Sequence, residues 1–139
     1  MFRKIMVPVD LAHAKALERA IGVATTLAGQ WNAPITFVGA TSPEPGPLGH
    51  NPQEYAAKLD AFAADIAARD GVTADAHALT LNDPTADLDK ALVKAISETG
   101  ADLVVMASHV PGLAEYVWPS HGGAVARHAT ASVFVVRPA

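Results

Sequence analysis

The chain has 139 residues, half of them hydrophobic, which is enough for one domain that buries a core of its own. Its formal charge of −4 provides no basic surface for nucleic acid or anionic lipid, and it has no cysteine for disulfides, thiol catalysis or a cysteine zinc site. With neither a secretory leader nor an apolar run near the ~18 residues of a membrane span, we expect a single cytoplasmic domain over residues 1–139 that binds no nucleic acid and no membrane.

Five short segments are predicted to form strands. In chain order they are Lys4 to Asp10, Ile35 to Thr41, Val72 to Leu81, Leu103 to Ser108, and Val133 to Val136 within the β-branched run Ser132 to Arg137. Four of them are continuous apolar runs, which are typical of strands buried on both faces of a parallel sheet. Val72 to Leu81 instead alternates small apolar and polar residues, so we expect an edge strand there.

Apolar residues at helical spacing separate these strands and predict helices around residues 17–27, 55–66 and 88–95, with a fourth across Ala124 to Ala129. The alternation predicts a Rossmann-like, doubly wound α/β domain with five parallel strands in the order 3-2-1-4-5. In that order a crevice opens at the carboxyl ends of strands one and four, with Asp10 and Ser108 at its rim. Ser42 to Pro52, with four prolines and two glycines, is predicted to be a mobile surface loop beside it.

The segment after the fourth strand has the layout of a phosphate cradle. Ser120 is a natural N-cap, and the residues after it offer free backbone N–H groups at the positive end of a helix dipole. An alternative is that Ser120 only caps the helix, while Gly122 and Gly123 allow close packing on the sheet.

Several stretches resemble landmarks of the universal stress protein family, and together they span essentially the whole chain. They are KIMVPVD at Lys4 to Asp10, Asp83-Pro84, ADLVVMASH at Ala101 to His109, and ARHATASVFVVR at Ala126 to Arg137. The resemblance implies a Rossmann-like domain that is usually a homodimer. Some members of the family bind ATP between strands one and four, and others bind none.

The chain departs from the glycine pattern of the nucleotide-binding members, which is Gly, two residues, Gly, nine residues, Gly and then Ser or Thr. Ala107, Val110 and Pro119 stand at the three glycine positions, the loop between Val110 and Pro119 is one residue shorter than in the pattern, and Ser120 matches the final Ser or Thr. Val110 is costly wherever the backbone needs a positive φ. However, the A-S-H-x-P form at Ala107 to Pro111 resembles a branch of the family that can still hold nucleotide.

The resemblance also implies an adenine site. Asp10 matches the position that lies against adenine, Pro8 and Val9 shape that wall, and backbone groups of Gly39 meet the adenine edge. An alternative is that Asp10 only ends a strand and caps the turn after it. The predicted nucleotide-binding residues are Pro8, Val9, Asp10, Gly39, Met106, Ala107, Ser108, His109, Val110, Ser120, His121 and Gly122.

Other kinds of functional site have less support in the sequence. His109 and His121 flank the cradle and can donate to phosphate, although a plain surface role is an equal alternative. A metal site from His109, His121 and His128 lacks a compact ligand motif, so we assign no metal ligand. Tyr116 and Trp118 are predicted to cover apolar surface at the loop. The loop has no Lys or Arg for a γ-phosphate, so we assign no catalytic residue and expect at most very slow ATP hydrolysis.

The leading hypothesis is a stress-response module that binds ATP or another adenine nucleotide, with or without Mg²⁺. It would act as a homodimer through its C-terminal strand, which lies at a sheet edge, and through an unidentified regulatory protein partner. The alternative is a stress protein without nucleotide that works through protein–protein interactions. A true hydrolase ranks last.

Overall fold

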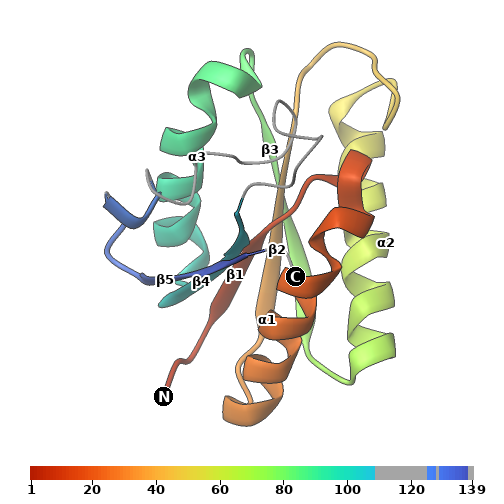
Figure 1. Ribbon diagram of the computed structural model, residues 1–139. Helices are drawn as coiled ribbons and strands as arrows, with labels where there is room; N and C mark the ends of the chain where they lie inside the picture. The colour runs from red at the N-terminus through yellow and green to blue at the C-terminus, as the bar shows by residue number, and fades with distance from the viewer. Residues whose placement is uncertain (109–124, 128, 138–139) are drawn as a thin grey trace.

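The computed structural model describes residues 1–108, 125–127 and 129–137, which form a five-stranded sheet with helices on both faces (Figure 1). The strands are β1 (Ile5–Pro8), β2 (Ile35–Thr41), β3 (Ala74–Thr80), β4 (Leu103–Ala107) and β5 (Ser132–Val136). All neighbouring pairs are parallel and the order is β3-β2-β1-β4-β5, which confirms the predicted sheet.

Three α-helices and one 3-10 helix are described, and residues 125–127 are helical where the fourth helix is expected. The 3-10 helix η1 (Leu11–Leu17) leads into α1 (Glu18–Trp31), and α2 (Pro52–Asp70) and α3 (Pro84–Thr99) come after it. In Figure 1, α1 and α2 cover one face of the sheet and α3 covers the other, as right-handed crossovers require. No helix in this described part is both long and apolar enough to span a membrane.

Polar caps and glycines fix where the helices begin and end. The side chains of Asn51 and Asp83 accept hydrogen bonds from the first turns of α2 and α3. Gly71 and Gly100 end the same two helices with φ of 67° and 73°, a conformation that glycine adopts without the steric cost of a Cβ.

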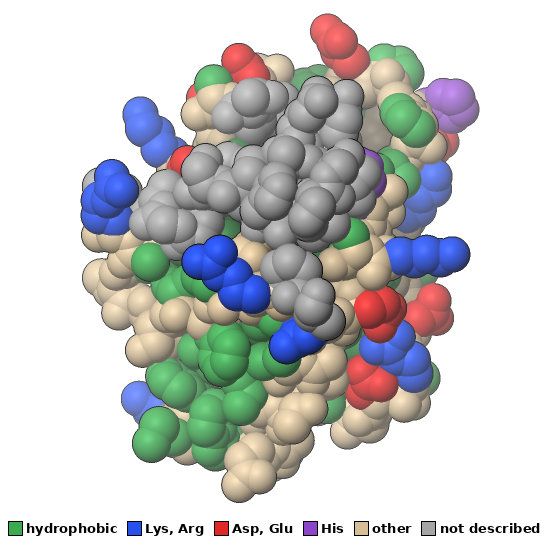
Figure 2. All heavy atoms as spheres, in the orientation of Figure 1, with side chains coloured by type: hydrophobic (Ala, Val, Ile, Leu, Met, Phe, Trp, Pro, Cys, Tyr) green, Lys and Arg blue, Asp and Glu red, His purple; other side chains and the backbone are tan. Residues whose placement is uncertain are grey.

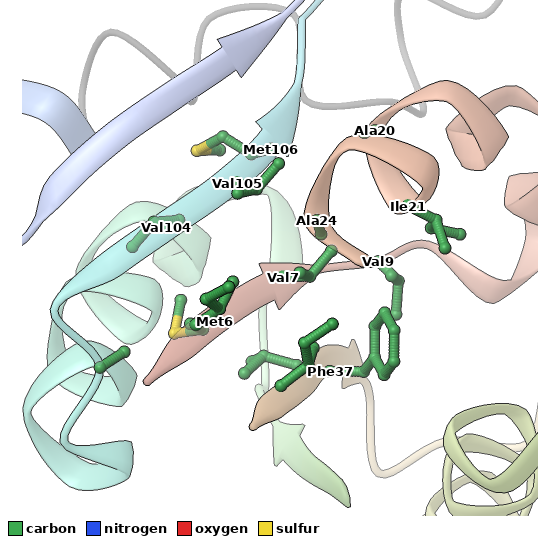
Figure 3. Close-up of a cluster of buried hydrophobic side chains, with 14 of the residues drawn as sticks. Met6, Val7, Val9, Ala20, Ile21, Ala24, Phe37, Val104, Val105 and Met106 are labelled. Carbon is green, nitrogen blue, oxygen red and sulfur yellow. The ribbon is translucent and has the colours of Figure 1, made fainter. Parts of the chain in front are cut away.

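The core lies around the central strands, as Figure 3 shows. All four residues of β1 and all five of β4 are buried, and Ala20, Ile21 and Ala24 of α1 pack against them. This explains the continuous apolar runs in the sequence, because a central strand of such a parallel sheet has helices packed on both of its faces. The rigid core holds the carboxyl ends of β1 and β4 in place.

Asp102 ties the opposite end of the sheet together. Its carboxylate accepts hydrogen bonds from the backbone N–H of Arg3 at 3.0 and 3.1 Å and from that of Lys4 at 3.0 Å. Burial alone would raise the pKa of Asp102, but these backbone donors outweigh it, so the pKa lies below the usual value. The segment before β1 is thereby fastened to the start of β4.

The two edge strands differ in exposure. β3 is partly buried along most of its length, and its edge position confirms the interpretation of the alternating pattern. At the other edge, β5 exposes 45% of Phe134 and 37% of Val135. Hydrophobic side chains also gather on the side of the molecule where β5 lies (Figure 2).

Three local predictions need correction. β1 ends at Pro8 and not at Asp10, because the chain turns there into η1, which the sequence pattern did not predict. β3 is shorter than Val72 to Leu81. Pro52 belongs to α2 and not to the preceding loop, since its fixed φ suits a first helical position. That loop contains a small turn closed by hydrogen bonds between Gly46 and Gly49, and its mobility remains a prediction.

Candidate functional site

The candidate site lies at the switch point of the sheet, where the strand order reverses next to β1. β1 sits between β2 and β4. Ser108 comes directly after the carboxyl end of β4, and Asp10 lies two residues after the end of β1. Doubly wound sheets bind ligands at this switch point, because the crossovers on either side leave in opposite directions and leave a crevice between them. The two rim residues of the predicted crevice are therefore on adjacent strands.

The carboxylate of Asp10 already contacts two residues that follow it in the sequence. Its Oδ1 accepts a hydrogen bond from the N–H of Ala12 at 3.0 Å, which makes Asp10 the N-cap of η1. Its Oδ2 lies 3.0 Å from Nδ1 of His13. The capping role that the sequence left open is thus present, and 23% of the Asp10 side chain remains exposed. A ligand that reached this carboxylate would share it with these two partners.

Pro8 and Val9 form a buried wall next to Asp10. Pro8 is the last residue of β1, and Val9 is 1% exposed. The N–H of Val9 donates to the carbonyl of Val38 at 2.8 Å, so this wall is fixed to β2.

Tyr55 of α2 covers Gly39 of β2. A Cβ added to Gly39 would overlap the Tyr55 hydroxyl and lie 3.2 Å from its Cζ. The Tyr55 side chain is almost fully buried, and burial together with the charge of Asp10 raises the pKa of its phenol. Packing against Tyr55 therefore explains why position 39 is a glycine, without any role for a ligand.

Strand register also decides which backbone groups face the crevice. The carbonyls of Val38 and Thr41 accept from Val9 on the β1 side and from Leu81 on the β3 side, respectively. Because the backbone groups of successive strand residues point to opposite neighbours, those of Gly39 point toward β3 and those of Ala40 point toward β1. The ladder of β1 with β2 stops at the pair Pro8 and Val38, before Ala40 is reached. Ala40 is thus a candidate that sequence reasoning missed.

The β4 side of the site is only partly described. Met106 and Ala107 are buried in β4, and the N–H of Ser108 donates to the carbonyl of Val136 at 2.8 Å. The remaining predicted residues lie outside the described part of the chain, namely His109, Val110, Ser120, His121 and Gly122. The cradle is therefore still a prediction. Tyr116, Trp118, Pro119 and His128 also lie outside it.

No cluster of three or more His, Cys, Asp or Glu side chains suited to a metal ion occurs among the residues described. The closest acid–histidine pairs there are Asp10 with His13 and Glu98 with His77, each 3.0 Å apart. A divalent ion in a protein site usually takes more protein ligands than one such pair offers.

The strand order and the helices on both faces define a doubly wound α/β domain with a candidate ligand site at the switch point of its sheet. The sequence model of the universal stress protein family matches residues 1–137, so the chain belongs to that family. This confirms the resemblance seen in the sequence.

Solved structures share the fold at low sequence identity. A universal stress protein from Archaeoglobus fulgidus has a TM-score of 0.71 at 20% identity over 97% of this chain and 98% of that one. A universal stress protein in complex with cAMP has a TM-score of 0.68 at 22% identity over 97% of each chain. A family protein from Arabidopsis thaliana with AMP bound has a TM-score of 0.68 at 15% identity, over 99% of this chain and 92% of that one.

Proposed function

We propose that this protein is an adenine-nucleotide-binding member of the universal stress protein family that acts as a homodimer. The nucleotide is ATP or a related adenine nucleotide, with or without Mg²⁺. The protein works in the cytoplasm through a regulatory protein partner and not as an efficient hydrolase.

One observation carries the proposal, namely the convergence of Asp10, Ala40 and Ser108 at the switch point of the sheet. Asp10 supplies a partly exposed carboxylate, which accepts hydrogen bonds from the amino group of adenine or from ribose hydroxyls. Ala40 turns its backbone donor and acceptor toward the crevice side, and this pair is complementary to a purine edge. Buried Val9 adds an apolar wall for the base.

Solved relatives support the choice of ligand class. Universal stress proteins have been crystallised with cAMP and with dAMP, and the Arabidopsis protein contains AMP. The part that these ligands share is an adenine nucleoside with a phosphate. We therefore expect the adenine and ribose to occupy the crevice here and the phosphates to extend toward the segment after Ser108.

The dimer rests on the exposed edge of β5. An edge strand presents unpaired N–H and C=O groups, and Phe134 and Val135 add exposed apolar surface to it. Pairing with a second copy about a two-fold axis covers both features at once.

A second candidate function has its own support. Asp10 already has two partners, and the Tyr55 side chain fills the space over Gly39. Both features are what a family member without nucleotide would show, because the crevice is then satisfied internally. Such a protein would act through its dimer or partner surface alone.

A purification experiment separates the two candidates. The protein is expressed, purified without added nucleotide and denatured, and the released small molecules are identified by chromatography. An adenine nucleotide in stoichiometric amount supports the first candidate. Its absence, together with no heat on titration with millimolar ATP, supports the second.

Two capping aspartates provide a matched pair of variants. Asp10→Asn keeps a good N-cap but loses the charge next to the end of β1, and Asp83→Asn makes the same change at the N-cap of α3, which follows the edge strand β3. We expect Asp10→Asn to weaken ATP binding by about tenfold, as loss of a charged hydrogen-bond acceptor should, and Asp83→Asn to leave it unchanged. Equal effects of the two variants would contradict the site.

A further inference from the structure

A small hollow lies beside the crevice, where α1 begins and where β4 and β5 end. Arg19 of α1, Ser108 after β4 and Arg137 after β5 line it, and its other walls are alanine and valine side chains. Lys and Arg side chains gather at the middle of the face shown in Figure 2, where β5 ends and α1 begins in Figure 1. Two cationic side chains that are 118 positions apart in the sequence thus meet at one place.

Neither arginine is neutralised within the described part of the chain. Arg19 and Arg137 are both exposed, and neither takes part in the ion pairs found there. The acid next to Arg19 in sequence, Glu18, is instead held by Arg69 of α2 at 3.2 Å. In a protein with a net charge of −4, a concave site with two unpaired arginines is selective for anions.

Ser108 adds an unsatisfied hydroxyl. Its Oγ is buried and has no hydrogen-bond partner among the described residues, where it is the one such side-chain atom. Its N–H is used by the carbonyl of Val136 at 2.8 Å, and this bond fixes the ends of β4 and β5 side by side. A buried hydroxyl without a partner is unfavourable, so within the described part of the chain the Ser108 hydroxyl is left available to a hydrogen-bonding ligand.

We propose that Arg19, Ser108 and Arg137 form a binding site for a single phosphate-type oxyanion. The guanidinium groups supply charge and forked donors, which match the oxygens of a phosphate, and Ser108 supplies a hydroxyl donor. The hollow is small and open to solvent, with room of about 20 Å³. Sites that enclose a drug-sized molecule are far larger, roughly 300–1,000 Å³. A single small anion can therefore sit at its mouth, but a whole nucleotide cannot be enclosed.

Two sources of that phosphate group are chemically equivalent at this site. One is free inorganic phosphate, and the other is the end of a nucleotide tail that starts in the crevice, since Ser108 borders both. The site does not require nucleotide binding, and it stands if the crevice is empty.

A titration of the full-length protein with inorganic phosphate at constant ionic strength tests the site. Nuclear magnetic resonance monitors the amide of Ser108 and the Nε–Hε groups of Arg19 and Arg137. We expect saturable shifts at these groups. Arg19→Gln or Arg137→Gln should each weaken binding by roughly tenfold, and Ser108→Ala should weaken it several-fold. Both arginines are exposed, so these variants should keep the melting temperature of the parent.

Lys58→Gln is the matched control, because it removes the same unit charge from an exposed position on α2. It should leave phosphate binding unchanged. Shifts that rise linearly without saturation, or a Lys58→Gln variant that loses as much affinity as Arg137→Gln, would overturn the proposal, since both outcomes indicate unspecific attraction to positive charge.

Titrations with ATP and adenosine distinguish the two sources. If a nucleotide tail fills the hollow, phosphate competes with ATP, and Arg137→Gln weakens ATP binding but not adenosine binding. If the site takes a free anion, phosphate and ATP bind together. If the protein binds no nucleotide but has this phosphate site, neither ATP nor adenosine binds, while phosphate still does.

Discussion

Replacing Gly39 with alanine should destabilise the protein, although alanine is normally no worse than glycine in a strand. The φ of Gly39 is not in the left-handed region, so the backbone itself accepts a side chain. The obstacle is Tyr55, whose hydroxyl occupies the place of the new Cβ. Because only 2% of Tyr55 is exposed, the ring cannot move into solvent without losing its burial.

The expected size can be worked out from these contacts. Inserting a methyl group into a packed core usually costs about 1–3 kcal/mol, and the overlap with a nearly immobile phenol places Gly39→Ala near 2–3 kcal/mol. In a Tyr55→Phe background the hydroxyl is gone, and the nearest atoms are then Cζ at 3.2 Å and Leu59 Cδ1 at 3.4 Å. The same substitution should then cost less than about 1 kcal/mol, so the two sites should couple by about 1–2 kcal/mol.

Urea unfolding of the parent, both single variants and the double variant measures this coupling. Gly29→Ala is the control, because the exposed Gly29 of α1 has open space around its Cβ position and alanine favours a helix. It should raise the free energy of unfolding by about 0.5–1 kcal/mol. If Gly39→Ala and Tyr55→Phe were additive to within ~0.5 kcal/mol, the packing explanation of Gly39 would be wrong.

Three further predictions concern pH and assembly. Asp102→Ala should lower the free energy of unfolding by about 1–2 kcal/mol at neutral pH, since it removes acceptors for three partly exposed backbone hydrogen bonds. Because the folded pKa of Asp102 is lowered, its contribution is present above the ordinary value of ~3.9 and is lost as pH falls, so urea titrations of parent and variant should converge in acid. Because the folded pKa of Tyr55 is raised, its contribution to stability is lost at high pH. The parent should lose stability above about pH 10, and Tyr55→Phe should lose less. Parallel curves for the two proteins would refute this. Val135→Asp should convert a dimer into a monomer in sedimentation at micromolar concentration, and an unchanged oligomeric state would remove β5 as the interface.

Periodicity and composition are sufficient to predict the sheet and its order. Continuous apolar runs and right-handed crossovers leave few other arrangements, and Ile35 to Thr41 is a strand with the bounds that its apolar run predicts. The 3-10 helix after Asp10 escapes prediction because its seven residues carry no long-range periodicity. An aspartate directly after a buried strand is the available signal, and it is recognisable as a cap only once the turn is known.

The details of the site depend on contacts that no local pattern contains. In a strand buried on both faces, the apolar pattern does not reveal which residue turns its backbone toward which neighbour, so the sequence cannot distinguish Gly39 from Ala40. Tyr55 is expected on the buried face of a helix, but its meeting with Gly39 depends on how α2 crosses the sheet. The same holds for Arg19 and Arg137, which come together only through the positions of α1 and β5.

Calorimetric titration of the purified protein with ATP tests nucleotide binding most directly. We expect saturable binding with one nucleotide per chain. The affinity should rise as the pH falls through the ordinary histidine range near ~6.5, and His121→Ala should flatten that dependence, since a protonated imidazole is a stronger donor to phosphate. Binding without any pH dependence would support the nucleotide site but contradict a contribution from the histidines. No binding at millimolar ATP would contradict the proposed nucleotide site.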